Sequence, residues 1–342
     1  MPARSLAKSL LSRLAPLALG LLVALPARAE TEVKFVLDWA LQGNHAMWAI
    51  ALEKGYFAKE GLKVTMDRGF GSGDSLIKVA SGAYDIGFCD VNGMVKFNAE
   101  NPSKPMLNVM MVFDNLLAAV VTLKSKNISK PADLAGKTLA SPDGEGSRLL
   151  FPAFAKANKV DPASIKWLSV TPQMRETLLV QGQTDGITGF TSTAIFNIKA
   201  AGVPVGDIVT MPYPEYGVPL YGNGLNTTAA YAEKNPQVIS GMIKASIAGW
   251  RDMVRDPKGS MASLKKRDPL LNDAVELERL QHVLDKALLT PAIKAKGIGT
   301  IEPERMVQSV TINAEAFNIA NPPKPESLYT TKFLPPQADR MP

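Results

Sequence analysis

The sequence predicts two α/β lobes with a cleft between them, followed by a group of long helices. From Glu30 onward short apolar runs alternate with helical stretches, which is typical of βαβ units and a largely parallel sheet. The alternation restarts at Ala118, and beyond Thr227 it gives way to long amphipathic helices. With 342 residues, 46% of them hydrophobic and 20% charged, the chain is long enough for two such lobes.

The first half contains four predicted strands, each followed by a polar loop and most by a helix. The strands are expected at residues 33–39, 62–70, 84–90 and 106–113, and the helices at 45–61, within 71–82 and at 91–102. In the first helix Trp48, Leu52 and Tyr56 recur at a spacing of four, which places them on one face. Gly61 is expected to end this helix.

The second half repeats this order and ends in helices. Strands are expected at 118–125, within 131–142, at 165–170 and at 184–190, and helices at 143–160, 172–183 and 192–202. A proline-rich segment, 209–225, precedes long amphipathic helices at 236–256, 272–289 and 303–320 and an extended tail at 321–336.

Residues 1–29 have the pattern of a cleaved export signal, with an uncleaved anchor as the alternative. Arg4, Lys8 and Arg13 precede the apolar stretch LAPLALGLLVAL, and Ala27-Arg28-Ala29 has the small-x-small cleavage pattern. The segment holds four basic residues and no acidic one, so the formal charge of +6 becomes +2 without it. Basic runs interleaved with aromatics are absent from the sequence, so it gives no case for nucleic-acid binding.

The small number of cysteines and histidines excludes some kinds of site. Cys89 is the single cysteine, which excludes an internal disulfide, and with two histidines a His/Cys zinc cluster is nearly excluded. We therefore expect an exported, soluble, monomeric protein of the periplasm that needs no cofactor or metal and does not insert into the membrane after cleavage. Its expected ligand is a small molecule.

Polar and aromatic side chains gather directly after the predicted strands, where ligands of open α/β sheets bind. The candidate ligand-binding residues in the first half are Asp38, Trp39, Asn44, His45, Gly71, Ser72, Gly73, Asp90, Asn92 and Asn115. The candidates in the second half are Glu145, Ser147, Arg148, Phe190, Tyr216, Tyr221 and Asn223.

Two glycine-rich loops, GSGDS at 71–75 and GEGSR at 144–148, precede predicted helices. Free backbone N–H groups at a helix start attract anionic or carbonyl oxygens, although neither loop has the Gly-Lys-Ser/Thr of a Walker loop. The alternative is that the glycines only form tight turns and Asp74 caps a helix.

Aromatic residues and histidine also leave alternatives open. Trp39, Phe190, Tyr216 and Tyr221 are candidate stacking faces for a flat ligand or core residues, whereas Trp48, Trp167 and Trp250 are expected in the core. His45 is a candidate for ligand hydrogen bonding or for a structural role at the helix start, and less so for catalysis. Cys89 ends an apolar strand and is expected to pack as a small hydrophobe.

Several segments together resemble one family, the substrate-binding proteins of bacterial ABC importers related to thiamine-pyrimidine-synthase-like and alkanesulfonate-binding proteins. The segments are LDW, NHAMWAIALEKGYFAKEGLKVT, GSGDSLIKVASGAYDIGF, ISKPADLAGKTLASP, YGVPLYGNGL and YTTKFLP. The resemblance covers essentially the whole chain after residue 29. EKGYF and PADLAGK belong to the scaffold and say little about the ligand.

The resemblance implies a type 2 periplasmic-binding-protein fold that traps its ligand by hinge closure. Residues 30–119 with 222–342 would form the first lobe and 120–221 the second, with crossovers near Ala118–Thr122 and Tyr221–Asn226. The protein would deliver a pyrimidine-like ring, another nitrogen heterocycle or a sulfonate to an ABC permease and its ATPase. In pyrimidine binders of this family, residues matching Asp38, Trp39, Asn44, His45, Glu145, Tyr216 and Tyr221 would hold the ring.

The same family includes an enzyme, the eukaryotic pyrimidine synthase, which is the main alternative. In that enzyme a lysine holds pyridoxal phosphate and a histidine is consumed just after the third strand. By the matching segment SGAYDIGF this chain has Cys89 and Gly93 at those positions, and it lacks the cysteine-rich motif. A third hypothesis is that the protein is an exported sensor subunit. For the ligand, Arg148 facing the cleft would favour an anion, whereas Glu145 in the cleft and Arg148 in solvent would favour an aminated ring.

Overall fold

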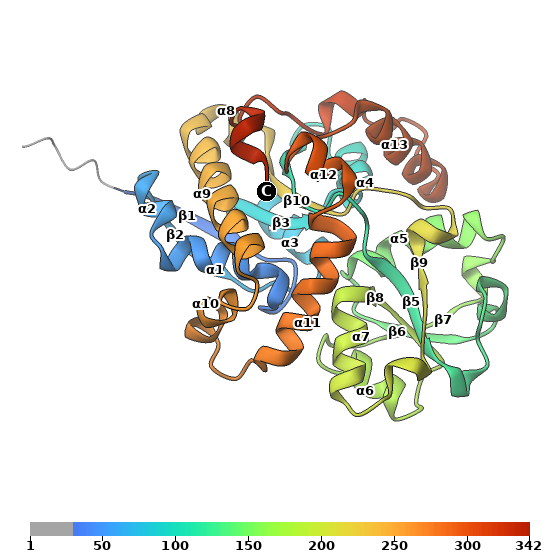
Figure 1. Cartoon of the computed structure of the whole chain (residues 1–342). Helices are drawn as coiled ribbons and strands as arrows, with labels where there is room; N and C mark the ends of the chain where they lie inside the picture. Colours follow the sequence, from blue (N-terminus) through green and yellow to red (C-terminus); the bar gives the residue numbers. More distant parts are fainter. Residues whose placement is uncertain (1–29) are drawn as a thin grey trace, which may run out of the picture.

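The computed structural model describes residues 30–342, which form two five-stranded mixed sheets flanked by helices (Figure 1). The predicted export signal lies outside the described residues. The first sheet has the order β2-β1-β3-β10-β4, and the second has the order β7-β6-β8-β5-β9. We call the first sheet with its helices the first lobe, and the second sheet with its helices the second lobe.

The first sheet consists of β1 (Thr31–Val36), β2 (Leu62–Asp67), β3 (Ile86–Asp90), β4 (Met106–Met111) and β10 (Asn223–Thr228). β1 is parallel to β2 and β3, whereas β10 is antiparallel to β3 and β4. A strand that follows the second lobe in the sequence therefore completes the sheet of the first.

The second sheet consists of β5 (Ala118–Leu123), β6 (Thr138–Ser141), β7 (Lys166–Ser169), β8 (Gly186–Phe190) and β9 (Ile208–Pro212). β6 is parallel to β7 and β8, and β5 is antiparallel to β8 and β9. The chain passes between the sheets at 112–117 and 213–222. The predicted crossovers, Ala118–Thr122 and Tyr221–Asn226, instead fall largely within β5 and β10, each of which belongs to one sheet.

Helices cover both sheets. Those of the first lobe are α1 (Ala46–Glu53), α2 (Tyr56–Lys59), α3 (Ser72–Ala80), α4 (Gly93–Glu100), α8 (Ala229–Lys234), α9 (Pro236–Arg255), α10 (Ser260–Arg267), α11 (Asp273–Val283), α12 (Pro291–Lys296) and α13 (Pro303–Phe317). Those of the second are α5 (Gly146–Ala157), α6 (Arg175–Val180) and α7 (Thr191–Ala200). Figure 1 shows α11 on the side of the first lobe that faces α7.

The packing of α1 against α9 anchors the loop that follows β1. Trp48 is fully buried, and its Nε1 donates to Ser246 Oγ at 3.0 Å. The helices approach so closely at Gly249 that a Cβ there would lie 1.9 Å from Met47 O. Trp48 also packs on Phe88 with ring centroids 4.6 Å apart. The first lobe thus holds the start of α1, and the loop before it, in a fixed place.

Two helices end earlier than predicted. The helix predicted at 45–61 is divided at Gly55, whose φ of +65° is the left-handed conformation that favours glycine. The helix predicted at 272–289 keeps α-geometry to Val283 and continues as one π-helical turn, Leu284–Leu288. Among residues 30–342, no helix has both the length and the apolar character that a membrane crossing requires.

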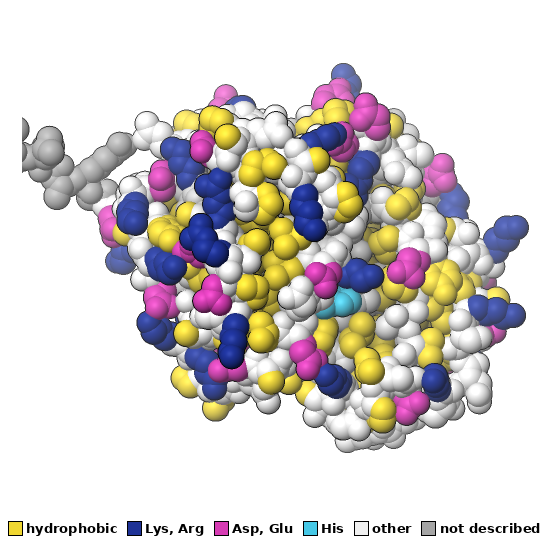
Figure 2. Space-filling view, viewed as in Figure 1, with side chains coloured by type: hydrophobic (Ala, Val, Ile, Leu, Met, Phe, Trp, Pro, Cys, Tyr) yellow, Lys and Arg dark blue, Asp and Glu magenta, His cyan; other side chains and the backbone are white. Residues whose placement is uncertain are grey.

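The surface carries both signs of charge. Figure 2 shows lysine and arginine interspersed with aspartate and glutamate over one face of the molecule, with apolar side chains between them. An interspersed pattern differs from the basic stripe that nucleic-acid binding uses.

Candidate functional site

A small cavity lies where the two lobes meet at the carboxyl ends of their strands. Its lining residues are Asp38, Trp39, Gly71 and Ser72 from the first lobe and Glu145, Arg175, Phe190 and Thr193 from the second. We call this space the central cavity. Its volume is about 20 Å³, enough for little more than one water molecule. The lobes are therefore closed on each other.

Asp38 is held in place by two side chains of its own lobe. His45 is fully buried and accepts the Gln42 backbone N–H at Nδ1, 3.1 Å away, so its proton lies on Nε2. Nε2 then donates to Asp38 Oδ1 at 3.0 Å, and Asn223 Nδ2 donates to Oδ2 at 2.7 Å. His45 and Asn223 thus orient the Asp38 carboxylate at the cavity wall.

Glu145 brings a second carboxyl group to the central cavity, from the opposite lobe. It caps α5, because its Oε2 accepts the Arg148 backbone N–H at 3.0 Å, and its Oε1 accepts from Ser147 Oγ at 3.1 Å. Glu145 is only 4% exposed, and this burial raises the pKa of its carboxyl group. An additional hydrogen-bond donor in the cavity would favour the ionised form.

Arg175 is the cation of the central cavity, and the sequence reading did not name it. Its guanidinium lies 4.8 Å from the centre of the Trp39 ring, across the lobe boundary. Its Nε donates to Glu176 Oε1 at 3.0 Å, so its charge already has a partner. The guanidinium packs against Gly189, where a Cβ would lie 2.9 Å from Cζ. Arg175 was missed because it lies inside a predicted helix, where a charged residue is expected to face solvent.

The glycine loops form the direct contact between the lobes. Gly73 N donates to Gly144 O at 2.9 Å. Gly71 has φ +134°, and a Cβ on it would lie 2.4 Å from Gly144 O. Both loops therefore use glycine for close approach of two backbones as well as for turning.

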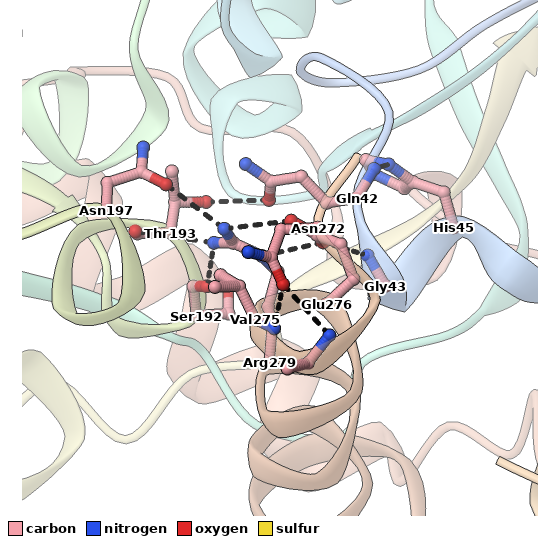
Figure 3. A network of polar contacts seen from close by, with 11 residues as sticks. Gln42, Gly43, His45, Ser192, Thr193, Asn197, Asn272, Val275, Glu276 and Arg279 are labelled. Atoms are coloured by element: carbon pink, nitrogen blue, oxygen red, sulfur yellow. Dashed lines mark hydrogen bonds and ion pairs between the residues drawn. The ribbon is translucent and has the colours of Figure 1, made fainter. Parts of the chain in front are cut away.

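A second contact between the lobes joins α7 to α11 and to the loop after β1 (Figure 3). Arg279 on α11 donates to Ser192 O and to Asn197 Oδ1, the latter at 3.0 Å, and pairs with Glu276 at 2.9 Å. Glu276 Oε2 in turn accepts the Gly43 backbone N–H at 2.6 Å.

One further hydrogen bond connects this contact between the lobes to the wall of the central cavity. Thr193 Oγ1, on the cavity wall, donates to Gln42 Oε1 at 3.0 Å. We call the set Gln42, Gly43, Thr193, Glu276 and Arg279 the α7–α11 latch. None of its members is among the candidate residues, and Glu276 and Arg279 were missed because charges in an amphipathic helix usually face solvent.

Several predicted site residues lie close to the central cavity without lining it. Asn44 is buried with an unpartnered Oδ1, Asn223 supports Asp38, and Ser147 supports Glu145. Asp90 and Asn92 are bonded to each other, since Asn92 Nδ2 donates to Asp90 Oδ1 at 2.8 Å.

Other predicted residues lie elsewhere in this closed structure. Arg148 lies over Trp167, 4.8 Å from the ring centre, and pairs with Asp143 of the same lobe. Tyr221 is core-packed beneath Arg305, and Tyr216 packs on Phe154.

Asn115 is bonded to Lys286 O beside the crossover. The structure brings neither the Arg148 side chain nor the two tyrosines to the central cavity.

The two lobes have the type 2 periplasmic-binding-protein fold. The alkanesulfonate-binding protein SsuA from Xanthomonas axonopodis pv. citri bound to MOPS matches with a TM-score of 0.67 at 16% identity, over 87% of this chain and 96% of that one. The periplasmic nitrate-binding protein NrtA from Synechocystis PCC 6803 matches with a TM-score of 0.62 at 12% identity, over 92% and 91%. The predicted fold is confirmed.

The sequence comparisons identify the family. The NMT1/THI5 like family model matches residues 42–260, and the chain belongs to that family. The formylaminopyrimidine-binding protein of Halalkalibacterium halodurans is 27% identical over 261 residues, which is 74% of this chain and 77% of that protein. The predicted family membership is confirmed, and these relatives are named as binding proteins.

Proposed function

We propose that this protein is the periplasmic solute-binding component of an ABC importer and that its solute is a flat, aminated ring. The central cavity supports this proposal most directly, because it combines carboxyl groups from both lobes, Asp38 and Glu145, with the aromatic faces of Trp39 and Phe190. Amino groups and protonated ring nitrogens would donate to the carboxyl oxygens, and the ring would stack on an aromatic side chain.

The distribution of charge favours an aminated ring over a sulfonate. Glu145 lines the central cavity, whereas Arg148 does not line it and pairs with Asp143. Arg175 does line the cavity, but Glu176 neutralises it. An anionic solute would have to approach two carboxyl groups with one compensated arginine, which costs electrostatic free energy.

Binding requires the lobes to open and reclose. A cavity of about 20 Å³ is far smaller than the roughly 150 Å³ that holds a benzene ring. The ring would enter while the loops at Gly73 and Gly144 are apart and would separate Trp39 from Arg175 on closure. The crossovers at 112–117 and 213–222 are the segments about which this hinge motion would occur.

The synthase alternative has little support in the site. The residue matching the cofactor lysine is Cys89, whose fully buried thiol has its pKa raised to about 12, chiefly by burial. The described residues that line the central cavity include no lysine. The formylaminopyrimidine-binding protein and SsuA are named as binding proteins, which favours capture without a covalent step.

A thermal-shift screen of aminopyrimidines, taurine, alkanesulfonates and cyclic ureas tests the proposal. A bound solute stabilises the protein by RT ln(1 + [L]/Kd), about 2.7 kcal/mol at a hundredfold excess over Kd. We expect stabilisation by aminopyrimidines. Stabilisation by sulfonates alone would contradict the ring assignment. Solute-dependent stimulation of a reconstituted permease and ATPase would support import, and its absence would favour the sensor reading.

A further inference from the structure

The guanidinium of Arg175 is held firmly at the wall of the central cavity. Its Nε and Nη2 both donate to Glu176 Oε1, at 3.0 and 2.5 Å. A Cβ on Gly189 would lie 2.9 Å from Arg175 Cζ and Nη1 and 3.1 Å from Nη2, and these nearly equal distances place it over the flat face of the guanidinium. The backbone at Gly189 therefore blocks the guanidinium from withdrawing into the second lobe.

The first lobe presents an aromatic ring to the same guanidinium. Arg175 Cζ lies over the Trp39 ring, 4.8 Å from its centre, and both residues line the central cavity. Arginine stacks on aromatic rings because its flat cation is attracted to the π electrons. In the closed structure Arg175 thus covers the side of Trp39 on which a bound ring would stack.

A ring that separates these two side chains would have Trp39 on one side and Arg175 on the other. A neutral ring is attracted to a cation over its face, whereas a ring that carries a positive charge is repelled by it. Glu176 pairs with Arg175 but does not line the central cavity, so the guanidinium is the member of the pair that would touch the ring. Arg175 is therefore placed to distinguish rings by their charge.

The carboxyl groups of the central cavity act in the opposite direction. Asp38 and Glu145 line the cavity and would attract a cationic ring. Arg175 lies near enough to Glu145 to lower the pKa of that carboxyl group, although burial raises it by more. An exocyclic amino group on a neutral ring also donates to a carboxylate. A neutral ring would thus keep these hydrogen bonds without placing a second positive charge beside Arg175.

We propose that Arg175 is a specificity-determining residue, which selects uncharged aminated rings over rings that carry a permanent positive charge. This inference rests on the proposed function, because it concerns the solute of the central cavity. Arg175 belongs to the second lobe and Trp39 to the first, so the selection takes place as the lobes close over the ring.

Calorimetric titration with a neutral and a cationic ring tests the proposal. The probes are 4-amino-6-methylpyrimidine and 4-amino-1-methylpyrimidinium, which are similar in size and differ in charge at pH 8. We expect the wild type to bind the neutral ring more tightly. The double variant Arg175→Met with Glu176→Gln removes both charges of the buried pair and leaves neither unpaired. It should lower the ratio of the cationic Kd to the neutral Kd by about tenfold or more.

Two further variants separate charge selection from a purely structural role. Arg148→Met is the matched control, because Arg148 lies over Trp167 at the same 4.8 Å but outside the central cavity, and it should leave the ratio unchanged. Arg175→Lys retains the positive charge and should keep the preference for the neutral ring.

Three results would overturn the role of Arg175: tighter binding of the cationic ring by the wild type, equal changes of both Kd values in the double variant, or loss of the preference in Arg175→Lys. Binding of neither ring by the wild type is a different result. It would contradict the proposed function itself, and this inference would fail with it.

Discussion

Replacing Arg279 with methionine should shift the lobes towards the open form and weaken ligand binding. Arg279 is 2% exposed, and its guanidinium reaches three acceptors on the second lobe: Ser192 O, Thr193 O at 3.3 Å and Asn197 Oδ1 at 3.0 Å. Methionine retains the apolar length of the side chain but donates no hydrogen bond.

The magnitude follows from the bonds that cross between the lobes. A hydrogen bond to a charged group contributes about 1.5–3 kcal/mol, and in the open form water would replace part of it. Losing these hydrogen bonds while Glu276 stays buried should destabilise the closed form by about 2–4 kcal/mol, which overlaps the roughly 3–5 kcal/mol for breaking a buried ion pair. Each 1.4 kcal/mol is tenfold, so the apparent Kd should rise by about 30- to 1,000-fold if closure is required.

Small-angle scattering and calorimetry with the solute from the thermal-shift screen would measure both effects. Arg251→Met is the matched control, because Arg251 donates to Met341 O and Ala338 O within the first lobe. The Arg279 variant should have a larger radius of gyration without ligand and a raised Kd, and the Arg251 variant neither change. A folded Arg279 variant with normal affinity would refute the role of the α7–α11 latch in closure.

Three further predictions concern the central cavity and its surroundings. Trp39→Ala should raise the Kd of a ring solute at least tenfold, as measured by calorimetry. Trp167→Ala, which changes a residue outside the central cavity, should leave the Kd unchanged. Equal effects of the two substitutions would show that Trp39 has only a structural role. Gly71→Ala should weaken ligand binding because its Cβ meets Gly144 O, whereas Gly82→Ala, with φ +80° and open space around it, should only lower stability. Equal affinities of these two variants would show that the loop contact does not matter for closure. The pKa of Asp90 is about 7 in the folded protein and about 3.9 in the unfolded chain. Between pH 4 and pH 7 the folded protein therefore keeps a proton on Asp90 that the unfolded chain has lost. Its contribution to stability therefore falls as pH rises from 4 to 7, by up to about 4 kcal/mol. Urea unfolding should show Asp90→Asn gaining stability over wild type at pH 7.5 relative to pH 4.5, and parallel pH profiles would contradict this.

A position at or just after the end of a strand was enough to find most of the central cavity. Asp38, Trp39 and Phe190 stand at the ends of predicted strands and Gly71 and Ser72 directly follow one, and the closed structure gathers all five around one space. Glu145 was named for its glycine loop. Because strand ends of a sheet meet at one edge, local sequence carries this information, although their role as ligand contacts stays a prediction.

The rest of the site, and the predicted residues that lie outside it, depend on contacts that sequence position does not encode. Glu145 caps α5, so Arg148, three residues later, extends over Trp167 away from the cavity. Arg175 and Arg279 look like surface charges of amphipathic helices, but Arg175 contacts Trp39 and Arg279 contacts Ser192 and Asn197 across the lobe boundary. Tyr221 lies within a crossover, yet its hydroxyl accepts the Glu302 N–H at 2.8 Å in the first lobe.

The insertion of β10 between β3 and β4 has a consequence for the order of folding during synthesis. The five strands of the second sheet lie in one continuous stretch, from Ala118 to Pro212. The first sheet lacks its connecting strand until Thr228 has emerged from the ribosome. A chain growing from its N-terminus therefore makes all the strands of the second sheet before it can complete the first. Asn223, the first residue of β10, brings the bond that orients Asp38, so the ligand-binding loop can take its final form only after this strand is inserted.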